Sequence, residues 1–142
     1  MEILLVEDNE DHAELVRRAL ADHQISNRIR HLSDGESALD YLLRRGAFED
    51  PALSPRPHVV LLDLRLPRVD GLEVLATLKA DPDLRRIPVV VFTTSDAERD
   101  LACAYASHVN SYLVKPVGFE GFQKLMDDFG LYWLGCNAYP HA

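Results

Sequence analysis

Polar residues that could handle phosphate or bind a metal ion stand at the ends of four apolar runs. Glu7-Asp8, Asp63 and Lys115 come directly after such runs, and Thr93 closes another. Carboxylates supply a nucleophile and hard oxygen ligands, a hydroxyl donates a hydrogen bond, and lysine supplies a positive point charge. Brought together, these groups favour phosphoryl transfer to an aspartate, because that chemistry depends on positioning and electrostatic stabilisation.

The three carboxylates of this set would repel one another unless a cation joined them. Like charges held close together raise each other's pKa values. Oxygen-only ligands favour a hard divalent ion, and Mg²⁺ needs few protein carboxylates because waters and phosphate complete its shell. We therefore predict that Glu7, Asp8 and Asp63 bind Mg²⁺ or another small divalent cation.

Each of these residues taken alone has an ordinary structural explanation. Glu7-Asp8 could cap a helix, since acidic residues favour helix N-termini. Asp63 could be a solvated loop residue, Thr93 is ordinary at the end of a strand, and Lys115 could be a surface lysine. Their occurrence at successive strand ends favours the functional interpretation over the structural one.

Short apolar runs alternate with helical patterns along the whole chain. The runs that we predict as strands are residues 3–6, 27–32, 58–63, 88–93 and 111–114. Strands that alternate with helices form a parallel sheet covered on both faces, because each parallel crossover needs a helix. The expected fold class is therefore α/β with a doubly wound sheet, in which the carboxyl ends of the strands bring the polar residues together.

The helices between these strands are predicted from apolar residues at helical spacing. They are expected at about 9–22, 35–45, 72–81 and 97–107, followed by a last helix that carries residues 119–129. Residues 46–57 contain three prolines and are predicted as a loop, either an insertion or a functional surface.

The composition limits the classes of protein that this chain can belong to. Its 142 residues, 47% hydrophobic and 27% charged, predict one soluble globular domain. The formal net charge of −8 argues against a nucleic-acid partner, which would need a basic patch. No apolar run is long enough for a membrane span or a signal peptide, so we expect a cytoplasmic protein. Cys103 is expected to be a buried thiol within a helix.

Four motifs together resemble the receiver domains of two-component response regulators. They are Glu7-Asp8, DLRLPRVDG at 63–71, Thr93-Thr94-Ser95 and YLVKP at 112–116. The resemblance covers residues 1–129 and is highly specific when the motifs are taken together. It implies a flavodoxin-like five-stranded parallel sheet of order 2-1-3-4-5 with five helices, and a phosphoacceptor signalling domain rather than an enzyme that acts on other substrates.

The resemblance also implies a role for each site residue. Asp63 would be the phosphoacceptor. Asp8, Asp63 and the backbone carbonyl of Arg65 would bind Mg²⁺ directly, and Glu7 would reach it through water. Glu7 stands where receivers more commonly have aspartate, which is a frequent variant.

Three further residues would contact or report on the phosphoryl group. Thr93 and Lys115 would contact it directly. Tyr112 would be the aromatic switch that turns inward when Thr93 moves toward the phosphate. The alternative for Tyr112 is a core aromatic residue, because aromatic residues are common in strands.

Three features are similar to those of phytochrome-associated response regulators. They are the proline-containing loop at 46–57, the Thr93-Thr94-Ser95 run and the aromatic tail at 131–135. This narrower resemblance implies a sensor histidine kinase such as a bacteriophytochrome as the phosphodonor. It also implies a homodimer through the fourth and fifth helices and the tail, although packing of the last helix would explain the tail equally well.

The expected organisation is a receiver domain at 1–129 and a C-terminal tail at 130–142 that extends the last helix. No segment is left for an output domain, so we expect the signal to pass to a downstream protein or phosphotransfer partner through protein contact.

Three other classes of protein fit these residues less well. An aspartyl-nucleophile phosphatase resembles a pattern with a second aspartate two residues after the first, and that position is Arg65. A dinucleotide-binding domain needs a glycine-rich turn where this chain has Glu7-Asp8. A pseudo-receiver that acts only as a scaffold normally lacks an acidic, acceptor or lysine position, and none is missing here.

Overall fold

The computed structural model describes residues 2–21 and 28–93, the main chain of 111–114, and a few single residues between 103 and 128. Most of the predicted fourth and fifth helices, together with Lys115 and the tail at 130–142, lies outside this part of the chain. Among the helices that are described, none is both long and apolar enough to cross a membrane.

Five strands form one parallel sheet, as predicted. The strands are β1 (Glu2–Val6), β2 (Arg28–Leu32), β3 (Val59–Leu62), β4 (Val89–Thr93) and β5 (Ser111–Val114). Their order is β2-β1-β3-β4-β5, and every neighbouring pair is parallel. This order confirms the sheet of a doubly wound α/β domain and places β1 and β3 side by side at its centre.

Three α-helices lie in the described residues, each close to its predicted position. They are α1 (Glu10–Ala21), α2 (Gly35–Leu43) and α3 (Gly71–Ala80). Helix α1 begins at Glu10 because the side chain of Asn9 accepts hydrogen bonds from the N–H groups of Asp11 and His12 at 2.9 and 3.1 Å. Asp34 and Asp70 cap α2 and α3 in the same way.

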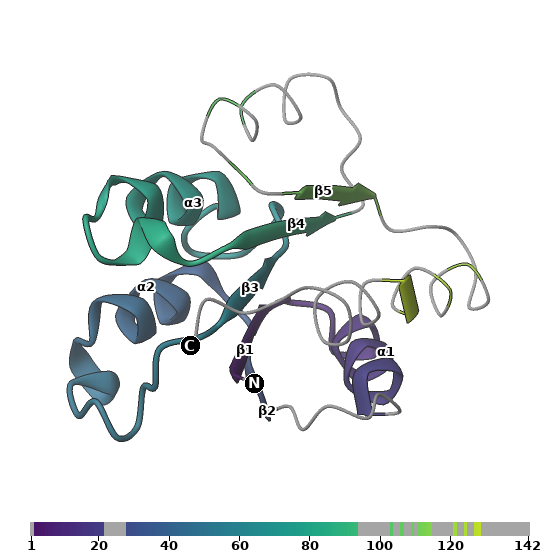
Figure 1. Cartoon of the computed structure of the whole chain (residues 1–142), viewed down its shortest axis with the longest axis horizontal. Coiled ribbons are helices and arrows are strands. Elements are labelled where there is room, and N and C mark those ends of the chain that lie inside the picture. The colour runs from purple at the N-terminus through teal and green to yellow at the C-terminus, as the bar shows by residue number, and fades with distance from the viewer. Residues whose placement is uncertain are drawn as a thin grey trace.

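The helices divide the core into one layer on each face of the sheet. Figure 1 shows α2 and α3 on one face and α1 on the other. Alternate residues of the central strands feed the two layers, so Val60 packs with α2 and α3 whereas Leu61 packs with α1. All four residues of β3 are fully buried, which explains its uninterrupted Val-Val-Leu-Leu sequence.

The segment at 46–57, predicted as a loop, has more regular structure than we expected. It begins with a short 3₁₀ helix, η1 (Gly46–Phe48), and continues through a hydrogen-bonded turn. Ser54 is fully buried, and its hydroxyl donates to the carbonyl groups of Phe48 and Asp50 at 3.1 and 3.2 Å. A second 3₁₀ helix, η2 (Leu84–Arg86), precedes β4.

The prediction of a buried Cys103 is wrong. Cys103 is helical and exposed, and so is Ala106 three residues further along. Residues three apart share one face of a helix, so this face lies toward solvent. Alanine occurs on both the buried and the exposed face of a helix, so the alanine-rich composition around Cys103 did not indicate which face is buried.

Candidate functional site

The register of the sheet brings together two acidic residues that are far apart in the sequence. Val6 at the end of β1 lies opposite Leu62 at the end of β3. The next residues along are Glu7 and Asp63, and the Asp63 N–H donates to the Val6 carbonyl at 3.0 Å. Both acidic residues therefore follow the carboxyl ends of adjacent central strands, where sites in parallel α/β sheets form.

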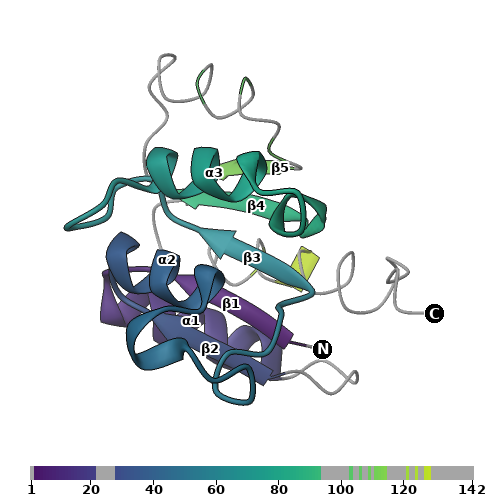
Figure 2. The same ribbon diagram turned by 90° about the vertical axis from the view of Figure 1, so that its left-hand side faces the viewer.

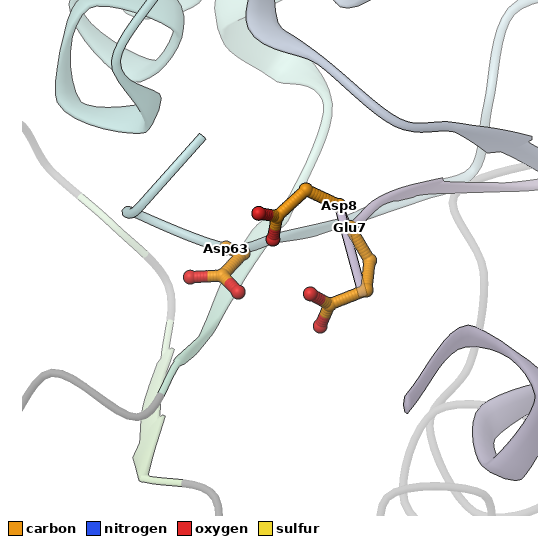
Figure 3. A group of neighbouring side chains, drawn as sticks. All are labelled: Glu7, Asp8 and Asp63. Atoms are coloured by element: carbon orange, nitrogen blue, oxygen red, sulfur yellow. The ribbon is translucent and has the colours of Figure 1, made fainter. Parts of the chain in front are cut away.

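Glu7, Asp8 and Asp63 form one carboxylate cluster. One carboxylate oxygen from each residue lies within 4.8 Å of the others. Figure 3 shows the three carboxylates around a common space. Glu7 and Asp63 are only 1% and 5% exposed, whereas Asp8 is exposed and gives the cluster access to solvent.

The electrostatic cost of this arrangement is large for buried groups. At 4.8 Å and an effective dielectric constant of about 20, two unit negative charges repel by about 3 kcal/mol. Burial adds a further cost to each charge of Glu7 and Asp63, because water no longer solvates it fully. A divalent cation would offset both costs, and an all-oxygen donor set is the one that Mg²⁺ and Mn²⁺ prefer.

Main-chain hydrogen bonds hold the two buried carboxylates in place. The Asn9 N–H donates to Oε2 of Glu7 at 3.2 Å. The Arg65 N–H donates to Oδ1 of Asp63 at 3.0 Å, so the residue predicted to offer its carbonyl to a metal also contacts the acceptor through its N–H. On the other side of Glu7, Nε2 of His31 lies 2.7 Å from the Glu7 carbonyl oxygen.

The loop after Asp63 is packed too tightly against α3 to accept a side chain at Gly71. The Gly71 N–H donates to the Leu64 carbonyl at 3.0 Å. A Cβ atom on Gly71 would lie 2.2 Å from the Asp63 carbonyl oxygen and 2.6 Å from Cα of Leu64. Glycine at the first position of α3 therefore lets the helix approach the main chain of the predicted acceptor.

A second glycine holds the far end of the same loop against α2. The Gly35 N–H donates to the Pro67 carbonyl at 3.3 Å. A Cβ atom on Gly35 would lie 1.9 Å from the Val69 carbonyl oxygen. The segment between β3 and α3 is thus fixed at both ends by main-chain contacts that only glycine permits.

The other predicted site residues lie on β4 and β5. Thr93 is the last residue of β4 and lies opposite Val114, the last residue of β5. Lys115 follows directly in the sequence but lies outside the described residues. Tyr112 lies opposite Val91 within β5, where the main chain alone is described. Their predicted contacts with a phosphoryl group therefore stay predictions.

Sequence reasoning gave no site role to three residues that shape the site: His31, Gly35, and Gly71, which it quoted only as part of the motif at 63–71. His31 lies near the carboxyl end of β2, so the rule that found the other polar residues at strand ends could also have found it. The glycines carried no comparable signal, because their importance depends on how closely Asp63 and Val69 approach them.

The fold and the cluster define an α/β domain with an acidic site at the carboxyl edge of its sheet. A family model described as the response regulator receiver domain matches residues 3–127. The chain therefore belongs to the response regulator receiver family, whose members are phosphoacceptor signalling domains.

Two relatives match the chain over nearly its whole length. It is 50% identical over 139 residues to the probable methanogenesis regulatory protein FilR2 of Methanothrix harundinacea, covering 97% of this chain and 86% of FilR2. It is 43% identical over 140 residues to response regulator Rcp1 of Synechocystis, covering 99% of this chain and 93% of Rcp1.

Solved structures of related regulators have the same fold. The Mn²⁺-bound form of Rcp1 matches with a TM-score of 0.93 and 42% identity over 98% of both chains. The phosphorylated cyanobacterial phytochrome response regulator RcpA matches with a TM-score of 0.92 and 39% identity, over 98% of this chain and 97% of RcpA. The homologues of this chain thus include phytochrome-associated response regulators.

Proposed function

We propose that this chain accepts a phosphoryl group on Asp63 from a sensor histidine kinase in a Mg²⁺-dependent reaction. The observation that carries the proposal is the nearly buried Asp63 carboxylate, which lies in one cluster with Glu7 and Asp8 at the carboxyl edge of the sheet. Membership of the receiver family supports the same role. The intact acidic cluster distinguishes this proposal from a pseudo-receiver that serves only as a scaffold.

The proposed reaction moves a phosphoryl group from a histidine of the kinase to a carboxylate oxygen of Asp63. The new O–P bond forms as the N–P bond breaks, and the electron pair of that bond returns to the imidazole, which takes up a proton. A carboxylate is a weak nucleophile, so the domain contributes mainly by positioning it. The Arg65 N–H that donates to Oδ1 supplies part of that positioning.

A bound Mg²⁺ would neutralise negative charge on the carboxylates and on the incoming phosphoryl group. Asp8, Asp63 and the Arg65 carbonyl would hold it directly, with Glu7 acting through water. The oxygen-only cluster of described residues supports this assignment, and the related Rcp1 has been solved with Mn²⁺ bound.

The phosphoryl group itself would be held by residues on the other side of the site. Thr93 would donate a hydrogen bond to one phosphoryl oxygen and Lys115 would pair with another. Tyr112 would then follow Thr93 inward and change the surface that a downstream protein reads. The positions of Thr93 and Tyr112 on adjacent strands β4 and β5 support this coupling.

The experiment that tests the acceptor compares the wild type with Asp63→Asn. Each protein is incubated with acetyl phosphate and Mg²⁺, and any acid-labile adduct is located by mass spectrometry. The wild type should gain one phosphoryl group on Asp63, and Asp63→Asn should gain none. Asp70→Asn is the matched control, because asparagine can still accept the Leu72 N–H that Asp70 binds at 2.9 Å. Labelling of Asp63→Asn to the wild-type extent would contradict the assignment.

We infer that the phosphodonor is a phytochrome-type kinase, and the similarity to RcpA supports this choice. FilR2, which is named for the regulation of methanogenesis, does not point to light. The test measures phosphotransfer from a purified bacteriophytochrome kinase under red and far-red light, with a histidine kinase that lacks a chromophore as the control. Transfer that depends on the light state is expected, and transfer only from the control kinase would contradict the inference.

A further inference from the structure

A second concave site lies at the amino-terminal ends of the strands, whereas Asp63 lies at their carboxyl ends. It has a volume of about 440 Å³ and is lined by the first residues of β1 and β2, by Tyr41 of α2 and by the segment after η1. Glu2 and Arg28 pair at the start of β1 and β2, whereas Asp63 follows the end of β3. Figure 2 shows the segment between α2 and β3 beside the N-terminal ends of these strands. The pocket is therefore separate from the acidic cluster.

Hydrogen bonds join the C-terminal end of α2 to the segment that forms the wall of this pocket. The Tyr41 hydroxyl donates to the Pro55 carbonyl at 2.7 Å, and the Arg44 guanidinium donates to the Ser54 carbonyl at 3.2 Å. Arg56 donates to the Leu42 carbonyl at 2.6 Å. A pocket whose wall is already ordered loses little entropy when it binds a ligand.

Arg30 lies over two aromatic rings of the pocket lining. The Arg30 guanidinium carbon is 5.3 Å from the ring centre of Phe48 and 5.9 Å from that of Tyr41. Stacking orients the planar guanidinium while leaving N–H groups at its edge for a carboxylate. Arg28 is paired with Glu2 at 3.5 Å, but among the described residues no carboxylate lies within ion-pair distance of Arg30.

The pocket also runs along β2, beyond which the described residues contain no further strand. Strand β2 is the last strand of the sheet on this side, and Arg28, Ile29 and Arg30 all line the pocket although consecutive side chains point to opposite faces. The Leu32 carbonyl accepts from the Glu7 N–H, so the main chain of Leu32 faces β1. Along a parallel strand, the main-chain N–H and C=O groups of successive residues face its two neighbours in turn. Ile29 lies three residues before Leu32, so its N–H and C=O point away from β1. Leu53, 57% exposed, adds apolar surface at the same place.

We propose that this pocket binds an extended segment of a partner protein in which a carboxylate side chain and an aromatic or aliphatic one stand two residues apart, so that both point to the face on which Arg30 and Phe48 lie. Arg30 would pair with the carboxylate, Phe48 and Leu53 would contact the apolar side chain, and the edge of β2 would bind the main chain. A basic, partly apolar pocket on a chain of net charge −8 favours an acidic partner segment at this one place. A free carboxylate would leave the edge of β2 without a partner.

The test titrates the full ¹⁵N-labelled chain with acetyl-Glu-Val-Phe-Val-amide and with its glutamine counterpart. Saturable amide shifts are expected at Ile29, Ala52 and Leu53 and not at Asp63. The glutamine peptide should bind about tenfold more weakly, because it loses the charge-assisted hydrogen bonds. Equal binding of both peptides, or no saturable shift at these amides, would overturn the proposal.

Variants and competing occupants complete the test. Arg30→Gln should weaken binding of the glutamate peptide about tenfold, and Arg85→Gln, which removes an exposed arginine on η2, should not. Leu53→Ser changes an exposed residue that should contact the apolar side chain of the peptide. It tests the same pocket if Arg30→Gln fails to fold.

Equal affinity for hydrocinnamate would assign the pocket to a free carboxylate. Loss of a dimer in Arg30→Gln by light scattering would assign it to a second copy, and either result would overturn the proposal.

Discussion

Single residues determine how the acidic cluster carries its charge. The N–H groups of Asn9 and Arg65 donate to Glu7 and Asp63. Two of the three acidic side chains are nearly buried, so solvent screens their repulsion poorly. A cation bound at this cluster would therefore stabilise the folded state as well as prepare it for phosphoryl chemistry.

We predict that Mg²⁺ stabilises the wild type by mass action and that Asp8→Asn weakens this effect. At a hundredfold excess over the dissociation constant, the free energy of unfolding should rise by about 2.7 kcal/mol, which is on the order of 10 °C in Tm. Asp8→Asn should require a higher Mg²⁺ concentration for the same shift. The measurement is thermal unfolding by circular dichroism across a Mg²⁺ titration.

Glu49→Gln is the control for the loss of one negative charge, because Glu49 is exposed and follows η1 rather than β1 or β3. It should respond to Mg²⁺ as the wild type does. A wild-type Tm that stays constant over the whole titration would show that the cluster does not bind the ion.

At the scale of secondary-structure elements, the approach of α3 to β3 decides where the predicted acceptor lies. We predict that Gly71→Ala destabilises the protein. Helix propensity alone would make this change favourable by up to about 1 kcal/mol. The new Cβ would instead lie 2.2 Å from the Asp63 carbonyl oxygen. Overpacking of this kind lowers the free energy of unfolding by about 1–3 kcal/mol. Urea denaturation gives the sign, and a stabilised Gly71→Ala would contradict the contact.

The matched comparison for Gly71→Ala is Ala76→Gly, at an exposed position further along α3. This change should cost up to about 1 kcal/mol from helix propensity and should leave phosphorylation unchanged. Gly71→Ala should also slow labelling of Asp63 by acetyl phosphate, because it displaces the acceptor main chain.

Helix α2 and the segment after it are joined by the buried Tyr41, and this contact should depend on pH. Burial, and secondarily the negative charge of Glu2, raises the pKa of Tyr41 above its usual value of 10.0. The stability that this hydroxyl contributes is complete below the unfolded pKa and is lost as the pH rises through the folded pKa. Tyr41→Phe removes the hydrogen bond to Pro55 and should cost about 1 kcal/mol at neutral pH.

The difference in the free energy of unfolding between wild type and Tyr41→Phe should therefore shrink as the pH rises from about 8 to about 11. Urea denaturation at several pH values measures it. A difference that stays constant over this range would show that the Tyr41 hydroxyl does not titrate there with a raised pKa.

At the scale of the whole molecule, the open question is which surface transmits the signal. Phosphorylation can act on another protein only by changing a surface that the other protein contacts. Most of the predicted dimer surface on the fourth and fifth helices, and all of the tail, lies outside the described residues, so this surface stays a prediction from the sequence. The division into a receiver at 1–129 and a tail at 130–142 has the same standing.

We predict a homodimer that the aromatic tail helps to form. Tyr132, Trp133 and Leu134 are large apolar or amphipathic residues, and burying them would contribute about 25 cal/mol per Å², part of which offsets the cost of association. Light scattering on the full chain should show a dimer, and a chain truncated after Leu131 should shift toward monomer. If the two chains have the same oligomeric state at micromolar concentration, the tail has no such role.

The sequence by itself determined the order of elements and the identity of the acidic cluster. Alternation of apolar runs with helical periodicity is a local signal, because burial on one or both faces constrains each residue type separately. Glu7, Asp8 and Asp63 could be found in this way, since each directly follows a strand and strand ends are visible in the sequence. The receiver motifs then placed these residues in a known family.

The tertiary structure alone decided the features that depend on residues far apart in the chain. The β1–β3 register brings Glu7 and Asp63 within reach, and the packing of α3 leaves no room for a Cβ at Gly71. The pocket beside Arg30 needs the folded segment after α2, which the sequence indicated only as a loop. Such contacts depend on strand register and on ångström-scale packing, and neither leaves a periodic trace in the sequence.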